Sequence, residues 1–272
     1  MAITTRDGAI AGMKMPRPLI KTGIAMANVG AMRGYTPWYA AGNPGASTAN
    51  AAGVNGAALT PASSAVEGRI PRVNPTVGQD AYLARLSMAP TTAGTLWLID
   101  RLWHNSGLVT TSITAQAITP VALPARDIAA STNGDGIMAA VEWSATGGAG
   151  TPTVTLTYTD EAGNAGQSAT LTGVTTPPVG TFEIFTLAAG DNGIRAPTSF
   201  IQSATRTSGT MHLVLFRLIA QLECPLANVG SSIDVLTGGR PEILDDSVLQ
   251  LVWFPTSTTV VNFIGSYAET QG

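Results

Sequence analysis

The chain contains few of the groups from which an active site or a covalent framework is built. Of its 272 residues, one is cysteine, two are histidine and 11% are charged, against about 25% charged residues in an average soluble domain. One cysteine cannot form an internal disulfide, and one cysteine with two histidines cannot build a Cys/His zinc site. A net charge of −3 is not typical of a nucleic-acid-binding protein, and no apolar run approaches the roughly 20 residues of a membrane span. We therefore expect no metal, no cofactor, no nucleic acid and no membrane.

Glycine and proline are abundant, and they are concentrated in the first part of the chain. Residues 1–78 contain 11 glycines and 7 prolines, and the prolines interrupt every candidate helix or strand. Residues 40–65 have almost no large apolar side chain, so they cannot offset a backbone entropy cost of about 1–2 kcal/mol per ordered residue. The composition predicts an extended, mostly irregular N-terminal arm over residues 1–78, followed by a body over residues 79–272.

Three aromatic residues stand close together inside this polar stretch. Tyr35, Trp38 and Tyr39 fall within five residues of one another. A tail without structure rarely contains so much apolar area. We predict that these three side chains anchor the arm, either to the body of the chain itself or to a neighbouring subunit.

The few charges are unevenly distributed along the chain. Residues 1–66 carry five basic residues against Asp7 alone, whereas the residues after Arg240 are acidic without a single basic one. This asymmetry is either chance in a charge-poor chain or a sign of head-to-tail complementarity between copies. The candidate electrostatic contacts are Arg6, Lys14, Arg17, Lys21 and Arg33 on one side, and Glu242, Asp245 and Asp246 on the other.

From about residue 80 the sequence follows the two-residue period of β-strands. Residues 153–159 alternate threonine with Val154, Leu156 and Tyr158, which is typical of a half-buried strand, and a turn-rich segment then leads to a return strand. Glycine- and asparagine-rich turns separate the other candidates. The predicted strands are 81–87, 95–103, 108–119, 137–144, 153–159, 167–174, 181–187, 198–207, 211–220, 248–254 and 259–267.

This succession of strands indicates an all-β fold. Helical periodicity is scarce beyond residue 80, and only a short helical turn near residues 241–246 is possible. About eleven strands with turns between them suit one antiparallel β-sandwich, with a jelly roll as the closest known architecture. We predict such a sandwich over residues 79–272, with Cys224 as a small buried apolar residue in it.

No motif predicts catalysis. Asp100, His104 and Ser106 have the residue types of a hydrolase triad, but they lack a strained nucleophile turn and lie too close on one strand. His104 is expected at a loop or strand end, and His212 on a face turned to solvent or to an interface. Residues 134–139 loosely match a dinucleotide-binding fingerprint but lead into a strand rather than a helix. We expect no enzyme, although 17 acidic residues leave a glycosidase-type carboxylate pair open.

Several segments together resemble the virion structural proteins of tailed bacteriophages. They are TTRDGAIAGMK (4–14), TPWY (36–39), DRLWHNSG (100–107), PARDIAASTNG (124–134) and GTPTVTLTYT (150–159). The resemblance covers most of the chain and identifies a family rather than a mechanism. By analogy with jelly-roll cement proteins, it implies a capsid decoration protein that forms homotrimers and stabilises the shell.

The resemblance also implies the partners and the location. They are other copies of the chain and the major capsid protein, at the capsid surface of a virion assembled in the bacterial cytoplasm. Two alternatives stay open: a tail-tube or other tail or neck component, and a glycan-binding or glycan-cleaving module. No functional residue is transferred from the family.

Overall fold

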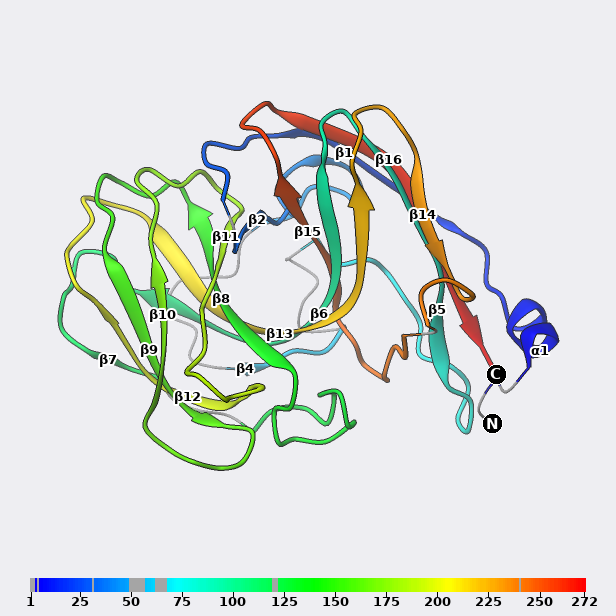
Figure 1. Cartoon of the computed structure of the whole chain (residues 1–272), viewed down its shortest axis with the longest axis horizontal. Coiled ribbons are helices and arrows are strands. Elements are labelled where there is room, and N and C mark those ends of the chain that lie inside the picture. Colours follow the sequence, from blue (N-terminus) through cyan, green and yellow to red (C-terminus); the bar gives the residue numbers. More distant parts are fainter. Residues whose placement is uncertain are drawn as a thin grey trace.

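The computed structural model describes residues 3, 5–30, 32–48, 57–61, 68–118, 122–239 and 241–272. The described chain is almost entirely antiparallel β-structure, which confirms the predicted all-β class (Figure 1). Its one described helix is α1 (Arg6–Ala11), which begins after Thr5, whose hydroxyl accepts a hydrogen bond from the Gly8 amide.

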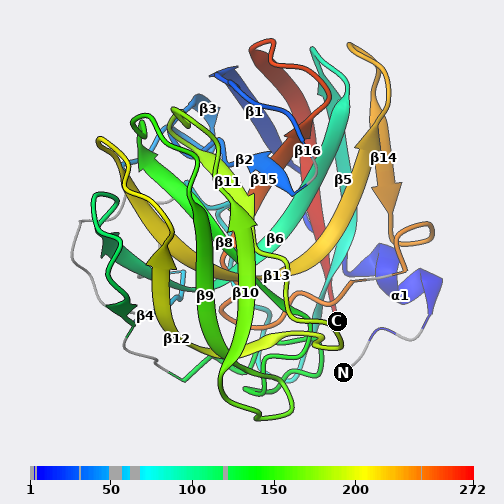
Figure 2. The ribbon, with the colours of Figure 1, turned by 60° about the vertical axis from the view of Figure 1, so that its left-hand side comes forward.

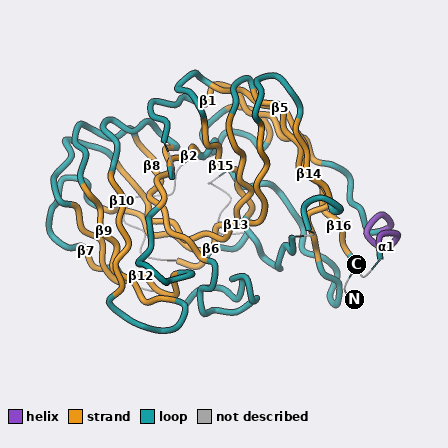
Figure 3. The backbone as a smooth tube through the Cα atoms, in the orientation of Figure 1, coloured by secondary structure: helices purple, strands orange, loops and turns teal. Residues whose placement is uncertain are grey.

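Six strands form a closed antiparallel ring at the centre of the molecule. In ring order, they are joined by the pairings of β13 with β8, β8 with β11, β11 with β2, β2 with β15, β15 with β6, and β6 with β13 again. Figure 3 labels β2, β6, β8, β13 and β15 around the centre of the tube drawing, and Figure 1 labels β11 beside β8. A closed ring leaves no unpaired edge within itself. The strands are β2 (Arg33–Tyr35), β6 (Gly94–Leu108), β8 (Ile137–Ala145), β11 (Thr181–Ile184), β13 (Thr210–Cys224) and β15 (Leu249–Pro255).

The interior of this barrel is apolar over much of its length. Alternate residues of the ring strands pack into one buried cluster, whereas the residues between them pack outward into two other cores. The inner cluster contains Ile99, Ala140, Phe182, Ile184, Val214, Phe216 and Val252. The short strand β4 (Ala57–Ala58) pairs with β6 farther along, next to His104 and Trp103.

A five-stranded sheet covers one side of the barrel. Its order is β14-β5-β16-β1-β3, and it packs against the ends of β6, β13 and β15 through a core that includes Leu19, Leu86 and Phe263. The segment between β1 and β3 crosses to the barrel and supplies β2. The strands are β1 (Arg17–Ile24), β3 (Ala41–Asn43), β5 (Ala81–Pro90), β14 (Ser231–Asp234) and β16 (Val261–Gln271).

A four-stranded sheet covers the other side (Figure 2). Its order is β10-β9-β12-β7, and the predicted alternation of residues 153–159 is confirmed, since Val154, Leu156 and Tyr158 are all buried in its core. Two sandwich-like halves thus share the long strands β6 and β13. The strands are β7 (Gln116–Ala117), β9 (Thr153–Asp160), β10 (Gln167–Thr172) and β12 (Ile194–Gln202).

The predicted boundary at residue 78 does not separate two structural units. Strand β1 pairs with β16 over most of its length, and β2 completes the barrel between β11 and β15. Much of the described N-terminal segment is irregular, but its backbone gains hydrogen bonds from strands of the body. This pairing does not require large apolar side chains, which is why composition alone predicted an arm. Of residues 40–65, the stretches 49–56 and 62–65 lie outside the described residues.

The aromatic anchor packs on the body of its own chain. Tyr35 is fully buried in the core under the five-stranded sheet, and its hydroxyl donates to the Asn28 carbonyl at 2.7 Å. Trp38 is buried and meets Tyr39 edge-on, with ring centroids 5.6 Å apart. The sequence left open whether these side chains pack on the body of their own chain or on a neighbouring subunit. In the described structure they pack on the body of their own chain.

Most predicted strands are present with ends shifted by a few residues. The prediction over 108–119 is wrong: β6 runs through Gly107 to Leu108, and only β7 returns within that span. No helix forms at 241–246, where Glu242 makes an isolated bridge with Tyr82. Cys224 is buried as predicted.

Closure of the barrel at β2 depends on a glycine, and this gives a first prediction. A Cβ atom on Gly34 would lie 2.5 Å from Val252 Cγ1 and 3.0 Å from Phe254 Cζ. We expect Gly34→Val to lower the free energy of unfolding by about 1–3 kcal/mol, because overpacking forces the ring strands apart. Urea denaturation measures this.

The matched control is Gly230→Ala, where an added Cβ meets no atom within 4 Å. We expect that variant to stay within about 0.5 kcal/mol of the original protein. Equal stability of the two variants would contradict a closed barrel at Gly34.

Candidate functional site

A cleft of about 650 Å³ opens where the beginning of the chain meets its end. One wall is the segment that leads from α1 into β1, the second is the extended segment 72–76, and the third is the last part of β16. Its lining is Lys14, Met15, Pro16, Arg17, Pro18, Arg72, Val73, Asn74, Thr76, Tyr267, Ala268, Glu269 and Gln271.

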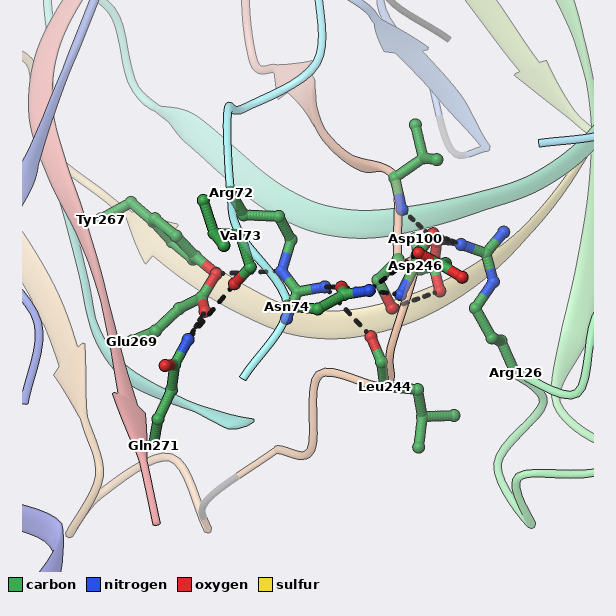
Figure 4. Close-up of polar contacts among 12 residues, drawn as sticks. Arg72, Val73, Asn74, Asp100, Arg126, Leu244, Asp246, Tyr267, Glu269 and Gln271 are labelled. Carbon is green, nitrogen blue, oxygen red and sulfur yellow. Dashed lines mark hydrogen bonds and ion pairs between the residues drawn. The ribbon is translucent and has the colours of Figure 1, made fainter. Parts of the chain in front are cut away.

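A buried ion pair lies at the inner side of the cleft. Arg72 donates from Nε to Glu269 Oε1 at 3.1 Å, and both side chains are almost completely buried. Figure 4 shows Tyr267 and Gln271 turned toward the same carboxylate. The Tyr267 hydroxyl donates to Oε1 at 2.5 Å, and Gln271 donates to Oε2 at 3.4 Å. Burial, and then the charge of Glu269, raise the pKa of Tyr267 well above its usual value, so this phenol stays protonated.

The same arginine ties the cleft to the C-terminal acidic segment. Arg72 Nη1 donates to the Asn74 side-chain oxygen at 3.0 Å and to the Leu244 carbonyl at 3.2 Å. Asn74 in turn donates to the Asp246 carboxylate at 2.8 Å and accepts from the Asp246 amide at 2.9 Å. These bonds fix segment 72–76 as a rigid wall (Figure 4).

Farther inside, the network reaches a second buried ion pair. Arg126 Nη1 lies 3.6 Å from Asp100 Oδ1 and also donates to the Asp246 carbonyl. Asp100 is fully buried and accepts from the Ser247 hydroxyl and the Val248 amide, each at 2.8 Å. The contacts of Asp100 therefore organise the start of β15 and do not form a catalytic triad with His104 and Ser106.

The outer part of the cleft is cationic and apolar. Lys14 and Arg17 are exposed and take part in no ion pair within the described part of the chain. Met15 and Val73 are 86% and 74% exposed on the same rim. Glu269 is the one carboxylate among the described residues of the lining, and it already accepts three hydrogen bonds. Such a surface can bind an acidic, partly apolar partner.

A second, smaller hollow of about 220 Å³ has the opposite charge. Asp80, Glu242 and Asp245 line it, and none of the described residues of its lining is basic. It adjoins the cleft, because Asp80 exchanges two backbone hydrogen bonds with Gly272 next to the cleft residue Gln271. Cationic and acidic surfaces thus lie on one end of the molecule.

The structure separates the predicted electrostatic residues into two groups. Lys14, Arg17, Glu242 and Asp245 line these two hollows. Arg6 is exposed on α1, and Arg33 donates to the Thr172 carbonyl at 3.2 Å. Arg72, Asp80 and Glu269 were not predicted from the sequence. None of them belongs to a motif, and they come together only in the folded chain.

Two of the predicted residues are already used inside the chain. Lys21 is buried, donates to the Ala40 carbonyl at 3.0 Å, and has its pKa lowered to about 8 by burial. Asp246 is exposed but is bonded to Asn74. Neither is a free contact for a second molecule.

Both histidines lie in the barrel, which corrects the predicted positions. His104 and His212 are buried on adjacent strands, with ring centroids 6.1 Å apart. They share the inner side of the barrel, since His104 pairs with Val214 and His212 pairs with Glu142 opposite Phe182. Long strands packed on both faces leave no solvent-facing side, so alternation alone misplaced them.

A buried ion pair accompanies the histidines. Arg101 Nη1 donates to Glu142 Oε2 at 2.5 Å, and the Thr36 hydroxyl lies 2.6 Å from Glu142 Oε1. The arrangement is closed off from solvent, because Arg101, Glu142, His104 and His212 are each at most 3% exposed. It contributes to the interior of the barrel rather than to a surface site.

The described residues hold no group of three or more His, Cys, Asp or Glu side chains that could bind a metal ion. In the part of the chain that the structure describes, no helix has the length and apolar character needed to cross a membrane. The chain matches no protein-family model, no curated protein and no solved structure. Its function is therefore argued from the residues and their geometry.

The buried histidines predict a pH-dependent stability. Burial and then the charge of Arg101 lower the pKa of His104 to about 2, while burial lowers that of His212 to about 4. The unfolded chain takes up these protons near pH 6.5. Between pH 6.5 and 4 the unfolded state therefore binds more protons than the folded state. As the pH decreases through this range, the free energy of unfolding decreases by up to about 1.4 kcal/mol per pH unit for each histidine.

Urea denaturation at pH 7, 6 and 5 measures this slope. In His212→Leu we expect roughly half of the slope between pH 6.5 and 5, because one of the two titrating groups is gone. An unchanged slope in that variant would show that His212 titrates in the folded protein as it does in the unfolded chain.

The cleft network gives a further prediction. Arg72→Met leaves Glu269 buried without its cation, and we expect a loss of about 3–5 kcal/mol in the free energy of unfolding. In the double variant Arg72→Met/Glu269→Gln we expect less than the sum of the two single losses. The control is Lys14→Met on the exposed rim, expected within about 0.5 kcal/mol of the original.

Proposed function

We propose that this protein is a structural component of a tailed-bacteriophage virion that decorates and clamps the capsid. Its class is supported by the resemblance of segments such as 4–14 and 100–107 to virion proteins. Its mode of action is supported by the exposed apolar and basic side chains around the cleft at one end of the all-β body. The partners are the major capsid protein and other copies of the chain, as homotrimers.

One observation carries the proposal: the three most exposed large apolar side chains of the described chain lie at a single cleft. Val77, Met15 and Val73 are 100%, 86% and 74% exposed, and they lie on or next to the cleft lining. Ile10 and Met13 add to the same end, since α1 contacts β16 and Met13 bridges to Thr270. Apolar side chains gathered on one surface mark an interaction site.

The rigidity of this end fits a clamping role. Segment 72–76 is tied to β16 through Arg72 and Glu269 and to the 244–246 segment through Asn74. A surface that is ordered before binding loses little conformational entropy on binding. Many weak contacts of this kind become strong when they are repeated over a shell.

The location in the particle tests the proposal. Purified virions that contain this chain are separated into capsids and tails, and both fractions are analysed by mass spectrometry. We expect the chain in the capsid fraction, with a solution mass of three copies. Recovery with tails, as a ring of six or more copies, would favour the tail-component alternative, and absence from both fractions would refute a virion role.

The cleft supplies a variant for the same assay. Met15→Glu/Val73→Glu places two charges on the apolar rim, where both side chains are mostly exposed. We expect wild-type stability with at least roughly tenfold less protein on the capsids, which corresponds to about 1.4 kcal/mol of binding free energy. The control is Ile128→Glu, an exposed apolar residue in the loop before β8.

A further inference from the structure

We infer that the cationic cleft of one copy binds the acidic hollow of another, so that this end of the molecule is its self-association surface. This inference rests on the proposed function and names the partner of the cleft. The cationic surface is defined by the exposed Lys14 and Arg17, and the acidic surface by Asp80, Glu242 and Asp245.

The cationic surface has charge to spare. Arg72 does not supply that charge, because it is buried, its Nη2 atom included, and is paired with Glu269. Lys14 and Arg17 extend from the rim. Among the described lining residues, Glu269 is the one acid and is neutralised by Arg72, which leaves the two positive charges of Lys14 and Arg17.

The acidic surface is the counterpart in charge. Glu242 and Asp245 are exposed and Asp80 is half-buried, and none of the three is in an ion pair with a described residue. The backbone holds them in place: Glu242 bridges to Tyr82, and the Ile243 amide donates to the Ala81 carbonyl at 2.8 Å. Arg217 donates to the Glu242 carbonyl at 3.2 Å from the interior, and the carboxylates of Glu242 and Asp245 remain exposed to a cation from outside.

A second copy fits both surfaces at once. The two hollows border the same segment, 72–81, yet they do not neutralise each other within one chain. Two copies facing each other, or copies arranged head to tail in a ring, bring every cationic cleft onto an acidic hollow. The exposed Val73 and Val77 lie on this same segment and would be buried by the contact.

A charge-reversal experiment tests the pairing. The first variant is Lys14→Glu/Arg17→Glu, and the second is Glu242→Lys/Asp245→Lys. These side chains are exposed, so both variants should fold, which circular dichroism and urea denaturation verify. The control is Arg195→Glu, an exposed residue of β12 in the four-stranded sheet. Analytical ultracentrifugation gives the association constant of each protein in low and high salt.

We expect the original protein and the control to associate, more weakly at high salt. Each reversal variant alone should associate at least roughly tenfold more weakly, because like charges then face each other. An equimolar mixture of the two variants should associate again, since each reversed surface meets its new complement. That recovery distinguishes direct pairing from a general loss of folding.

Three results would overturn the inference. The first is that the original protein is monomeric at every protein and salt concentration. The second is that the reversal variants associate as strongly as the original protein, and the third is that the mixture of the two variants stays dissociated. If the monomeric protein still binds capsids through Lys14 and Arg17, the occupant of the cleft is the shell protein. The proposed function then stands and the self-association surface does not. Absence from virions, in contrast, removes the proposed function whatever the association constants are.

Discussion

The pairing of β6 with β13 is the contact on which the rest of the structure depends. It joins Gly94 to Cys224 at one end and Leu108 to Met211 at the other, and it closes the ring of six strands. One half of this pair forms a wall of the core under the five-stranded sheet, and the other half does so under the four-stranded sheet. Two sandwich-like halves thereby become one body, and the surface at the chain ends is held on a rigid support.

Closing the barrel buries polar and charged side chains, and their desolvation is unfavourable. Those that face into the barrel include Arg101, Glu142 and the two histidines. Of the 31 charged residues of the chain, 12 are buried among the described residues. Buried charges are tolerated when they are paired and hydrogen-bonded, as Arg72 is with Glu269 and Arg101 with Glu142. The chain is thus poor in charge overall, and its surface is poorer still.

Strands could be predicted from the sequence where burial is one-sided. Residues 153–159 alternate because one side of β9 faces the core and the other does not. The same reasoning failed for His212, since β13 is covered on both sides and its pattern carries no information on direction. It also failed for β1 and β2, whose place depends on backbone pairing with β16, β11 and β15 far along the chain. The cleft could not be predicted for a related reason: Arg72 and Glu269 are 197 residues apart.

The uneven charge distribution along the sequence acquires a different meaning in three dimensions. Because β1 lies beside β16, Lys14 and Arg17 from the basic beginning come to the same end of the molecule as Glu242 and Asp245 from the acidic end. Lys21 and Asp246 are hydrogen-bonded to other residues of the chain. Lys14, Arg17, Glu242 and Asp245 have no ionic partner among the described residues. These exposed charges of both signs make no ion pair within the described chain and so do not stabilise its fold through one. They can specify the register of contact between molecules whose remaining surface is nearly neutral.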